Sequence, residues 1–501
     1  MQTLHSPLDA ASWLRQHVTG QLRTDSRQVQ PGDAFIAWPG AATDGRRFLA
    51  QALARGAAVC LLEQQGHEAW TPSLSAADVA QLAMMTDLKA QTGPMADAYY
   101  ERPSEKLSVL AVTGTNGKTS TAWWLAQALG ALSQPCGLMG TLGVGVLPDL
   151  ESTGLTTPDP VLMQQQFRLW ADAGVRHCAM EASSIGLAEH RLTGTRIQVA
   201  VFTNFTQDHL DYHGDMGRYW AAKEVLFDWP GLSSAVINVD DPEGAKLAAR
   251  LTRQGLDVWT CSRQGPARLQ ALALTDPHGL AFEVREGTEV QTLRTGLIGD
   301  YNIDNLLGVI GSLRALGVDL ADAVSACGQL SAVPGRMQWV SAATRQPMAV
   351  VDYAHTPDAV THTLSALRAQ AVKRGGQLWC VLGCGGDRDP IKRPLMAAAA
   401  EAAADHVVLT SDNPRSESPE AILAQMRAGL LRADRAVVHI DRAEAIAWAV
   451  THAAAADVVL VAGKGHETYQ EIQGVRMPFD DVAQVQAALQ GRVNTVQGVA
   501  A

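Results

Sequence analysis

The sequence has little that would direct the chain out of the cell or into a membrane. Its 501 residues contain no apolar run long enough to span a bilayer. The first residues also lack the basic start and the continuous apolar segment of a signal peptide. We therefore expect a cytoplasmic protein with no membrane partner.

Cysteine and basic residues are also scarce. The seven cysteines form no Cys-x-x-Cys pair, which argues against a zinc site or a disulfide framework and favours buried, reduced thiols. Lys and Arg number 40 against 51 Asp and Glu, giving a formal net charge of −11. Nucleic acids and anionic membranes bind basic faces, so neither is an expected partner. We expect a monomer that binds small molecules and meets any anionic ligand with local positive charges.

The length of the chain indicates several domains. A chain of 501 residues is too long for one hydrophobic core, and typical domain sizes suggest about three. Apolar runs alternate with helical stretches, which is the pattern of parallel α/β sheets. The polar stretch YYERPSEKLS predicts a linker after the first domain. We expect a small N-terminal α/β domain over residues 1–105, a central parallel-sheet domain over 106–333 and a C-terminal Rossmann-like α/β domain over 334–501.

One stretch, LSVLAVTGTNGKTSTAWWLAQAL (Leu107–Leu129), predicts a phosphate-binding loop. Val109–Val112 is typical of a buried strand, and Thr119–Leu129 has the apolar positions of a helix. Glycines between them let backbone N–H groups close on an anion, the helix N-terminus adds partial positive charge, and Lys118 adds a full charge. The standard pattern has a glycine where this chain has a valine, so the loop is a shortened variant. The alternative is an ordinary strand-to-helix turn, but the adjacent Lys118 and Thr119 favour ATP.

Acidic and histidine side chains follow apolar runs elsewhere in the central domain. MEASS and TNFTQDHLDYHGD place Glu181, Asp208 and His209 just after predicted strands. Divalent cations on phosphates take oxygen ligands with an occasional imidazole. Glu181 and His209 beside Thr119 therefore predict a magnesium site, although a structural role for these side chains is equally compatible with the sequence.

In the last third of the chain, four polar or charged residues each follow an apolar run. His355, Arg388, Arg415 and Glu467 each come just past an apolar run. In open α/β sheets ligands bind outside the carboxyl ends of the strands, so these ends predict one shared site. Four unrelated solvent loops are the alternative.

The chemistry of that site suits an amino acid. The planar fork of Arg415 in SDNPRSE grips a carboxylate through two parallel bonds, and Asp412 and Glu467 can receive an ammonium group. Asp-Asn-Pro is also a generic turn. An ATP loop in one domain and an amino-acid pocket in the next indicate a ligase, in which a carboxylate is phosphorylated and then attacked by an amine.

Motifs along the whole chain resemble those of a known protein family. In order along the chain, TGTNGKTS, MEASS, FTNFTQDHLDYHGDM, YWAAKEVLF, GDYNIDNLLG, PGRMQ, VVDYAHTPDA, GCGGDRD, KRPLM, TSDNPRSE and AGKGHETYQ resemble the Mur ligases of peptidoglycan synthesis, and DSRQVQPGDAFIAWPG extends the resemblance to the start. The resemblance implies a UDP-binding domain, a P-loop ATPase domain and an amino-acid-binding domain. It also implies the addition of meso-diaminopimelate to the D-glutamate γ-carboxylate of a UDP-linked muramoyl dipeptide, with ATP and Mg²⁺, through an acyl phosphate.

The resemblance assigns site residues by motif. For ATP it implies Gly114, Thr115, Asn116, Gly117, Lys118, Thr119, Ser120, Asn302, Asn305, Arg336, Asp352 and His355. For magnesium it implies Thr119, Glu181, His209 and Lys223, the last as a carbamylated lysine (N6-carboxylysine), and Lys118, Glu181, His209 and Lys223 form the catalytic set. For the muramoyl dipeptide it implies Ser26, Thr156, Thr157, Ser183, Glu189 and Arg191. For diaminopimelate it implies Arg388, Asp412, Asn413, Pro414, Arg415, Gly463 and Glu467. By residue type alone, Lys223 would be a solvated helix lysine.

Some positions depart from the family pattern while leaving the catalytic set whole. Leu155 stands where the family has a polar residue, and Ile185 stands in place of a histidine. Gln207 replaces an arginine, and Glu189 replaces a glutamine. The segment AATDGR lacks a common His-Gln pair near the uracil. These changes bear on the muramoyl-peptide and uracil contacts.

Two other functions compete with this one. Folylpolyglutamate synthases share a GTNGK loop, but glycine typically follows the lysine there, whereas Thr119 follows here. A P-loop regulator without ligase activity would need no amino-acid pocket. Arg415 is expected to set specificity, because a lysine substrate would leave its guanidinium buried and unpaired.

Overall fold

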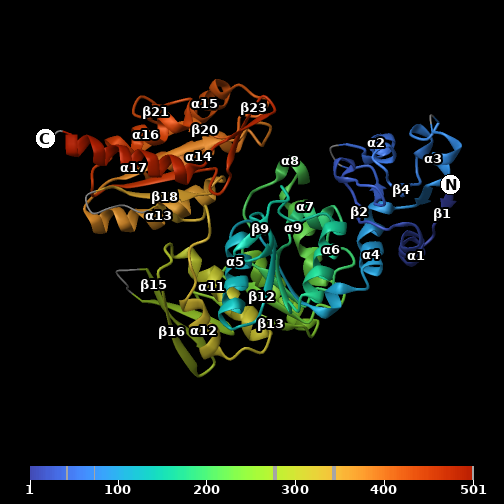
Figure 1. Cartoon of the computed structure of the whole chain (residues 1–501). Coiled ribbons are helices and arrows are strands. Elements are labelled where there is room, and N and C mark those ends of the chain that lie inside the picture. Colours follow the sequence, from blue (N-terminus) through green and yellow to red (C-terminus); the bar gives the residue numbers. More distant parts are fainter. Residues whose placement is uncertain (41–42, 73, 275–278, 341–345, 499–501) are drawn as a thin grey trace.

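The structure is a computed structural model that describes residues 1–40, 43–72, 74–274, 279–340 and 346–498. Three α/β domains follow one another along the chain, each built around its own sheet (Figure 1). The α/β fold class expected from the sequence is therefore confirmed. Within the described residues, no helix combines the length and the apolar character that crossing a bilayer requires.

The N-terminal domain contains a five-stranded parallel sheet in the order β1-β5-β4-β3-β2. Its strands are β1 (Gln2–Thr3), β2 (Leu22–Arg23), β3 (Ala34–Ala37), β4 (Val59–Glu63) and β5 (Leu82–Met85). Its helices are α1 (Pro7–His17), α2 (Leu49–Ala54), α3 (Ala76–Ala80) and α4 (Leu88–Tyr99). The stretch expected to be a linker is not open coil, because it forms the short 3-10 helix η4 (Pro103–Lys106) with a buried Ser104.

The central domain contains an eleven-stranded sheet in the order β16-β15-β14-β13-β12-β11-β6-β10-β7-β8-β9. Its strands are β6 (Ser108–Thr113), β7 (Cys136–Gly140), β8 (Gly143–Val146), β9 (Asp149–Glu151), β10 (His177–Glu181), β11 (Val199–Phe202), β12 (Ser234–Asn238), β13 (Asp257–Ser262), β14 (Leu269–Leu274), β15 (Leu280–Glu286) and β16 (Glu289–Thr295). Its helices are α5 (Lys118–Ala131), α6 (Pro160–Asp172), α7 (Ser184–Ala188), α8 (Leu210–His213), α9 (Met216–Glu224), α10 (Pro242–Arg253), α11 (Tyr301–Ala315) and α12 (Leu320–Gly328). The parallel middle was expected, whereas the antiparallel additions at both edges were not.

The C-terminal domain contains a six-stranded sheet in the order β17-β18-β22-β19-β20-β21, in which only β17 runs antiparallel to its neighbour. Its strands are β17 (Gln338–Val340), β18 (Met348–Asp352), β19 (Leu378–Cys384), β20 (His406–Ser411), β21 (Val437–Val438) and β22 (Val458–Ala462), with a separate hairpin of β23 (Tyr469–Ile472) and β24 (Val475–Pro478). Its helices are α13 (Pro357–Arg374), α14 (Lys392–Ala403), α15 (Pro419–Arg427), α16 (Arg442–His452) and α17 (Asp481–Gly498).

Both faces of the central sheet are covered, which explains why its strands are continuously apolar. On β6, Leu110 and Val112 join one buried hydrophobic cluster, while Val109 and Ala111 join the cluster on the opposite face. Successive side chains of a strand point to opposite faces, so a strand buried on both sides needs apolar residues at every position. The residues after such a strand are then the first that can be polar.

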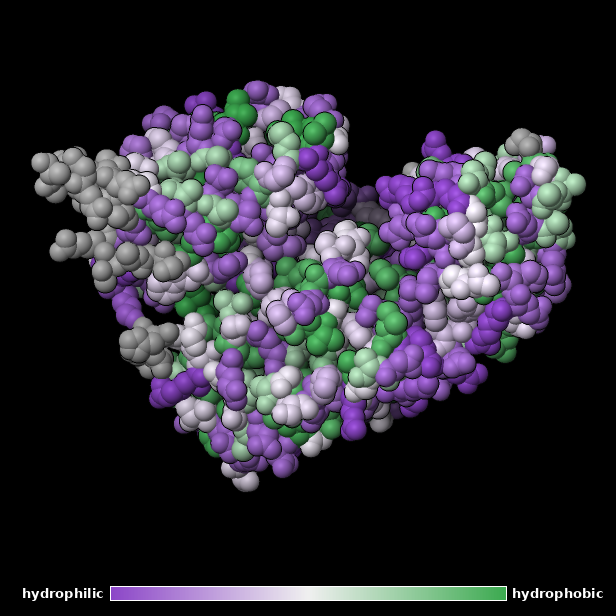
Figure 2. Space-filling model, in the orientation of Figure 1, coloured by the Kyte–Doolittle hydropathy of each residue, from purple (hydrophilic) through white to green (hydrophobic). Residues whose placement is uncertain are grey.

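Figure 2 shows the surface hollowed between the C-terminal lobe at the upper left and the N-terminal lobe at the right, above the central domain. The loops after β6, β10 and β11 and the loops after β18, β19, β20 and β22 contribute the residues that line the cavities between the central and C-terminal domains. Ligands of open α/β sheets bind at such strand ends.

Candidate functional site

The glycine loop after β6 is held in a shape that only glycine allows. Gly114 and Gly117 have φ angles of +143° and +85°, and a Cβ on Gly114 would lie 1.9 Å from the hydroxyl oxygen of Thr203. Between them, the N–H of Asn116 donates to Oδ1 of Asn204 at 2.9 Å, and the Thr203 hydroxyl donates to the carbonyl of Asn116 at 2.6 Å. The loop after β11 therefore fixes the loop after β6.

Lys118 begins α5 and turns back over this loop. Its ammonium group donates to the carbonyls of Gly114 and Thr115, both at 2.9 Å. Burial lowers the pKa of Lys118, and the nearby carboxylates of Glu181 and Asp208 oppose that shift. Since its direct partners are neutral carbonyls, the lysine charge is available to an anion in the loop.

Thr119, Glu181 and His209 line the same cavity and are residue types that suit a hard cation. The Thr119 hydroxyl donates to Oε2 of Glu181 at 3.0 Å, and Oε1 of the same carboxylate accepts from the N–H of Thr141 at 2.8 Å. Burial lowers the pKa of His209 to about 4 against the opposing charge of Asp208, so its imidazole is neutral and can act as a ligand. Hydroxyl, carboxylate and neutral imidazole together fit magnesium on a phosphate. Among the described residues, no set of three His, Cys, Asp or Glu side chains is already gathered into a metal site.

Residue type alone predicts that Lys223, on α9, is exposed to solvent, and this prediction is wrong. It is 1% exposed rather than solvated, and its Nζ donates to the carbonyl of Gly114 at 2.6 Å. The ring of Tyr219 lies 4.4 Å from the same nitrogen. Burial, reinforced by the charge of Lys118, holds the pKa of Lys223 well below its ordinary value.

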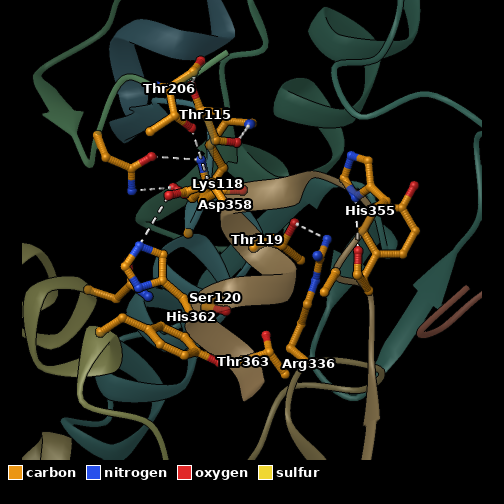
Figure 3. Close-up of a pocket in the computed structure, with 18 of the residues that line it drawn as sticks. Thr115, Lys118, Thr119, Ser120, Thr206, Arg336, His355, Asp358, His362 and Thr363 are labelled. Atoms are coloured by element: carbon orange, nitrogen blue, oxygen red, sulfur yellow. Dashed lines mark hydrogen bonds and ion pairs between the residues drawn. The ribbon is translucent and has the colours of Figure 1, made fainter. Parts of the chain in front are cut away.

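The C-terminal domain closes over the loop. Arg336 reaches across to the Thr119 hydroxyl, to which its Nη2 donates at 3.2 Å (Figure 3). The amide of Asn116 donates to Oδ2 of Asp358 at 3.1 Å. A cavity of about 350 Å³ lies between the two domains. Its lining includes eleven of the twelve residues that the resemblance assigned to ATP, namely Thr115, Asn116, Gly117, Lys118, Thr119, Ser120, Asn302, Asn305, Arg336, Asp352 and His355, and Gly114 does not line it.

A second cavity, of about 810 Å³, continues from the first. It is lined by six of the seven residues assigned to diaminopimelate, namely Arg388, Asp412, Asn413, Arg415, Gly463 and Glu467, and Pro414 does not line it. The two cavities share the lining residues Thr141, Thr156, Asp208, His209, Tyr353 and His355. The glycine loop and the arginine turn thus line adjoining cavities that share part of their walls.

Cationic and anionic groups are both available in the second cavity. Arg388 and Arg415 donate to the carbonyls of Asp387 at 3.1 Å and Gly386 at 2.7 Å. Within the described part of the chain, neither guanidinium forms an ion pair with a carboxylate. Burial and the neighbouring Asp412 raise the pKa of Glu467.

The residues assigned to the muramoyl dipeptide are only partly brought together. Thr156 lines both cavities and Ser183 lines the first, and the Thr157 hydroxyl lies 2.9 Å from that of Ser183. Arg191 donates to the carbonyl of Thr157 at 3.0 Å, outside both linings. Ser26 lies in the N-terminal domain, where its hydroxyl donates to Gln51 at 2.8 Å.

The departures from the family pattern have distinct positions. Leu155 and Ile185 line the second cavity, whereas Gln207 is exposed. Glu189 forms an ion pair with Lys89 of the N-terminal domain. Of AATDGR, residues 41–42 lie outside the described residues.

Sequence reasoning assigned no role to two lysines of the site, Lys392 and Lys464, although it did single out His355 and Asp208. Lys392 and His355 both lie 3.9 Å from the Asp208 carboxylate, and together with His209 they lower the pKa of Asp208 to about 2 despite its burial. Lys464 lies fully buried beside Glu467. Both lysines belong to quoted motifs, KRPLM and AGKGHETYQ, but Asp208 beside Lys392 and Asn413 beside Lys464 come from distant segments.

Comparison with known families covers most of the chain. The model of the Mur ligase middle domain matches residues 112–313, that of the glutamate ligase domain matches 335–465 and that of the catalytic domain of the family matches 19–99. A UDP-N-acetylmuramoyl-L-alanyl-D-glutamate--2,6-diaminopimelate ligase of Acidovorax sp. (strain JS42) is 57% identical over 98% of this chain and 99% of its own length. The enzyme of the same name from Pseudomonas aeruginosa is 46% identical over 94% of both chains.

Solved structures agree with these matches. A UDP-N-acetylmuramoyl-L-alanyl-D-glutamate--2,6-diaminopimelate ligase is 37% identical, with a TM-score of 0.63 over 94% of this chain and 95% of its own. A folylpolyglutamate synthase of Mycobacterium tuberculosis, 21% identical with a TM-score of 0.62 over 75% of this chain and 92% of its own, shares the fold alone. With relatives this similar along nearly its entire length and all three domain models matched in order, the chain belongs to the Mur ligase family.

Proposed function

We propose that the chain is an ATP-dependent ligase that adds meso-diaminopimelate to the D-glutamate γ-carboxylate of UDP-N-acetylmuramoyl-L-alanyl-D-glutamate, a step of cytoplasmic peptidoglycan precursor synthesis. The supporting observation is the shared wall between the cavity at the glycine loop and the cavity at Arg415. An acid activated in the first cavity can meet an amine held in the second without leaving the protein. Relatives of 57% and 46% identity have names that state this reaction.

The phosphate side activates the acid. Backbone N–H groups of the glycine loop and the charge of Lys118 hold the ATP phosphates, and Arg336 approaches the same place from the C-terminal domain. Positive charge at this point stabilises the transferred phosphoryl group as negative charge builds up on its oxygens. Thr119, Glu181 and His209 would hold Mg²⁺, which supplies further charge neutralisation when bound.

The amino-acid side supplies the nucleophile. Asp412 and Glu467 receive ammonium groups of diaminopimelate, while Arg388 and Arg415 receive its carboxylates. L-Lysine lacks the distal carboxylate, so its binding would leave a desolvated arginine without a partner. The muramoyl dipeptide would extend from Ser26 in the N-terminal domain to Thr156 and Ser183 at the shared wall.

Lys223 is proposed to be carbamylated. A lowered pKa favours the neutral amine of Lys223, and a neutral amine nitrogen can bond to the carbon of CO₂ and release a proton. The product is a carboxylate-like group beside Gly114, where it could orient a metal ion.

The assay that tests this function measures phosphate release from ATP with the UDP-linked dipeptide and one of three amino acids. Diaminopimelate is expected to support release at least about 10³-fold better than L-lysine or L-glutamate, because an unpaired buried arginine discriminates strongly. Comparable release with L-lysine would contradict the role of Arg415, and release with L-glutamate alone would favour the folylpolyglutamate-type alternative.

A variant separates the two cavities. Arg415→Ala is expected to raise the KM for diaminopimelate about 100-fold while changing the KM for ATP less than about twofold, since Arg415 lines only the second cavity. Exposed Arg218→Ala serves as the matched control. Equal changes in both KM values after Arg415→Ala would defeat the assignment.

A further inference from the structure

Lys464 is a buried cation beside the proposed amino-acid pocket that does not itself line it. It lies two residues after the end of β22, is 0% exposed and is absent from the lining of the second cavity. Its Nζ donates to Oδ1 of Asn413 at 3.1 Å and to Oε2 of Glu467 at 3.0 Å. Both partners do line the cavity. A ligand in the cavity would therefore contact the partners and not the lysine.

The three side chains form a closed triangle. The amide of Asn413 donates to the same Oε2 of Glu467 at 2.7 Å. The Asn413 oxygen that accepts from Lys464 also accepts the N–H of Glu471 at 2.9 Å, which ties the triangle to β23. Among the described residues, every hydrogen bond recorded for the Glu467 carboxylate ends on Oε2. Oε1 is left to a ligand.

We propose that Lys464 is a positioning residue of the amino-acid subsite, holding Glu467 so that Oε1 receives an ammonium group of the substrate. The proposal rests on the proposed function, because it assigns the role of one buried lysine within that site. Lys464 acts through Glu467 and touches no substrate atom.

The charges around Glu467 give Lys464 a second effect. Asp412 at the end of β20 and Tyr353 after β18 face Glu467 with Lys464, and Arg442 at the start of α16 adds a more distant charge. Burial and Asp412 raise the pKa of Glu467, whereas Lys464 and Asn413 oppose the rise. Without Lys464 that pKa rises further. The carboxylate is then lost at a higher pH as the solution is acidified, and the protonated acid no longer attracts an ammonium group.

The test is Lys464→Met, which keeps the length of the side chain and removes its charge. The KM for diaminopimelate is expected to rise about 10- to 100-fold, since hydrogen bonds to charged groups are each worth a factor of this size. The KM for ATP is expected to change less than about twofold. The pH below which the KM for diaminopimelate begins to rise is expected to move upward, because the variant lacks the cation that keeps Glu467 ionised.

Two further variants test whether Lys464 acts through Glu467. In a Glu467→Gln background, Lys464→Met is expected to add less than about a twofold change, because residues that act through one another are not additive. Lys246→Met removes another lysine paired with a glutamate three residues away, at 2.7 Å on the surface of the central domain, and is expected to leave all KM values unchanged.

Each outcome has a defined meaning. A wild-type enzyme that does not use diaminopimelate refutes the proposed function and this inference with it. An active wild type whose KM for diaminopimelate is unchanged by Lys464→Met overturns the inference alone. A variant with a lower unfolding midpoint and equal rises in the KM values for ATP and diaminopimelate also overturns it, because such a lysine would be merely structural.

Discussion

Buried lysines on the two sides of the cleft are held in opposite ways. In the central domain, Lys118 and Lys223 donate to backbone carbonyls of the glycine loop. In the C-terminal domain, Lys464 is bonded to the carboxylate of Glu467. Lys223 and Lys464 are fully buried, whereas Lys118 is half-buried. Of these three lysines, only Lys464 has an acid of the described residues within hydrogen-bonding distance.

The different partners of these lysines indicate which kind of ligand each side of the cleft can bind. An ammonium group that is bonded only to neutral carbonyls, as Lys118 is, favours the entry of an anion, so the phosphate side is prepared to bind one. On the amino-acid side, buried arginines already have carboxylate partners. Arg442 pairs with Asp481 at 2.7 Å, and Arg393 pairs with Glu417 at 2.7 Å. Arg388 and Arg415 line the cavity together with Asp412 and Glu467, as suits a ligand carrying both signs.

The largest effect on turnover is expected from the phosphate side. Lys118→Met removes the charge that faces the transferred phosphoryl group, and kcat/KM should fall at least about 10³-fold in the phosphate-release assay. The unfolding midpoint should not fall, because a buried, uncompensated charge has been replaced by an apolar chain of similar length. A loss below about tenfold would mean that the loop does not hold the reacting phosphate.

A smaller loss is expected at Lys223. Lys223→Ala should lower kcat about 10- to 100-fold, because it removes a group that orients a metal ligand set rather than one that contacts the phosphoryl group. Acetate or formate added at high concentration should restore part of the activity by occupying the vacated space. Indifference of the rate to both the substitution and the added carboxylates would indicate a purely structural lysine.

The smallest effect on turnover, but a large effect on stability, is expected from the neutralised pair in the C-terminal domain. Asp481→Asn leaves the fully buried Arg442 without its counter-ion, and the free energy of unfolding of that domain should fall by about 3–5 kcal/mol in urea titrations. The matched control is Glu471→Gln, which removes the partner of the exposed Arg476 and should cost less than about 1 kcal/mol. Equal losses of unfolding free energy from the two substitutions would contradict the stabilising role of the buried Arg442–Asp481 pair.

Local sequence was sufficient for the elements that bear the site. The expected strand Val109–Val112 appears as β6 (Ser108–Thr113), and the helix expected from Thr119 begins one residue earlier, at Lys118. The apolar runs before His355, Arg388, Arg415 and Glu467 are all strands. A strand buried on both faces must be apolar throughout, so the first glycine and charge after it mark its end.

The antiparallel edges of the central sheet could not be predicted in the same way. β15 (LAFEVRE) is largely buried and β16 (EVQTLRT) is largely exposed, and neither pattern specifies the partner or the direction of the strand. The burial of Lys223 had no local signal either. Lys223 lies on α9, and its bonding partner Gly114 is in a loop more than a hundred residues earlier in the chain.

The sequence by itself determined the α/β class, the phosphate loop and the amino-acid chemistry of the last domain, because each depends on residues that are neighbours along the chain. Only the tertiary structure decided that the glycine loop and the Arg415 turn share a wall, that Lys223 is withdrawn from water and that Lys464 is buried against Asn413. Those outcomes depend on how sheets and domains pack. Packing sets the solvation of a charge and its distance from a counter-ion, and residue type alone does not specify either quantity.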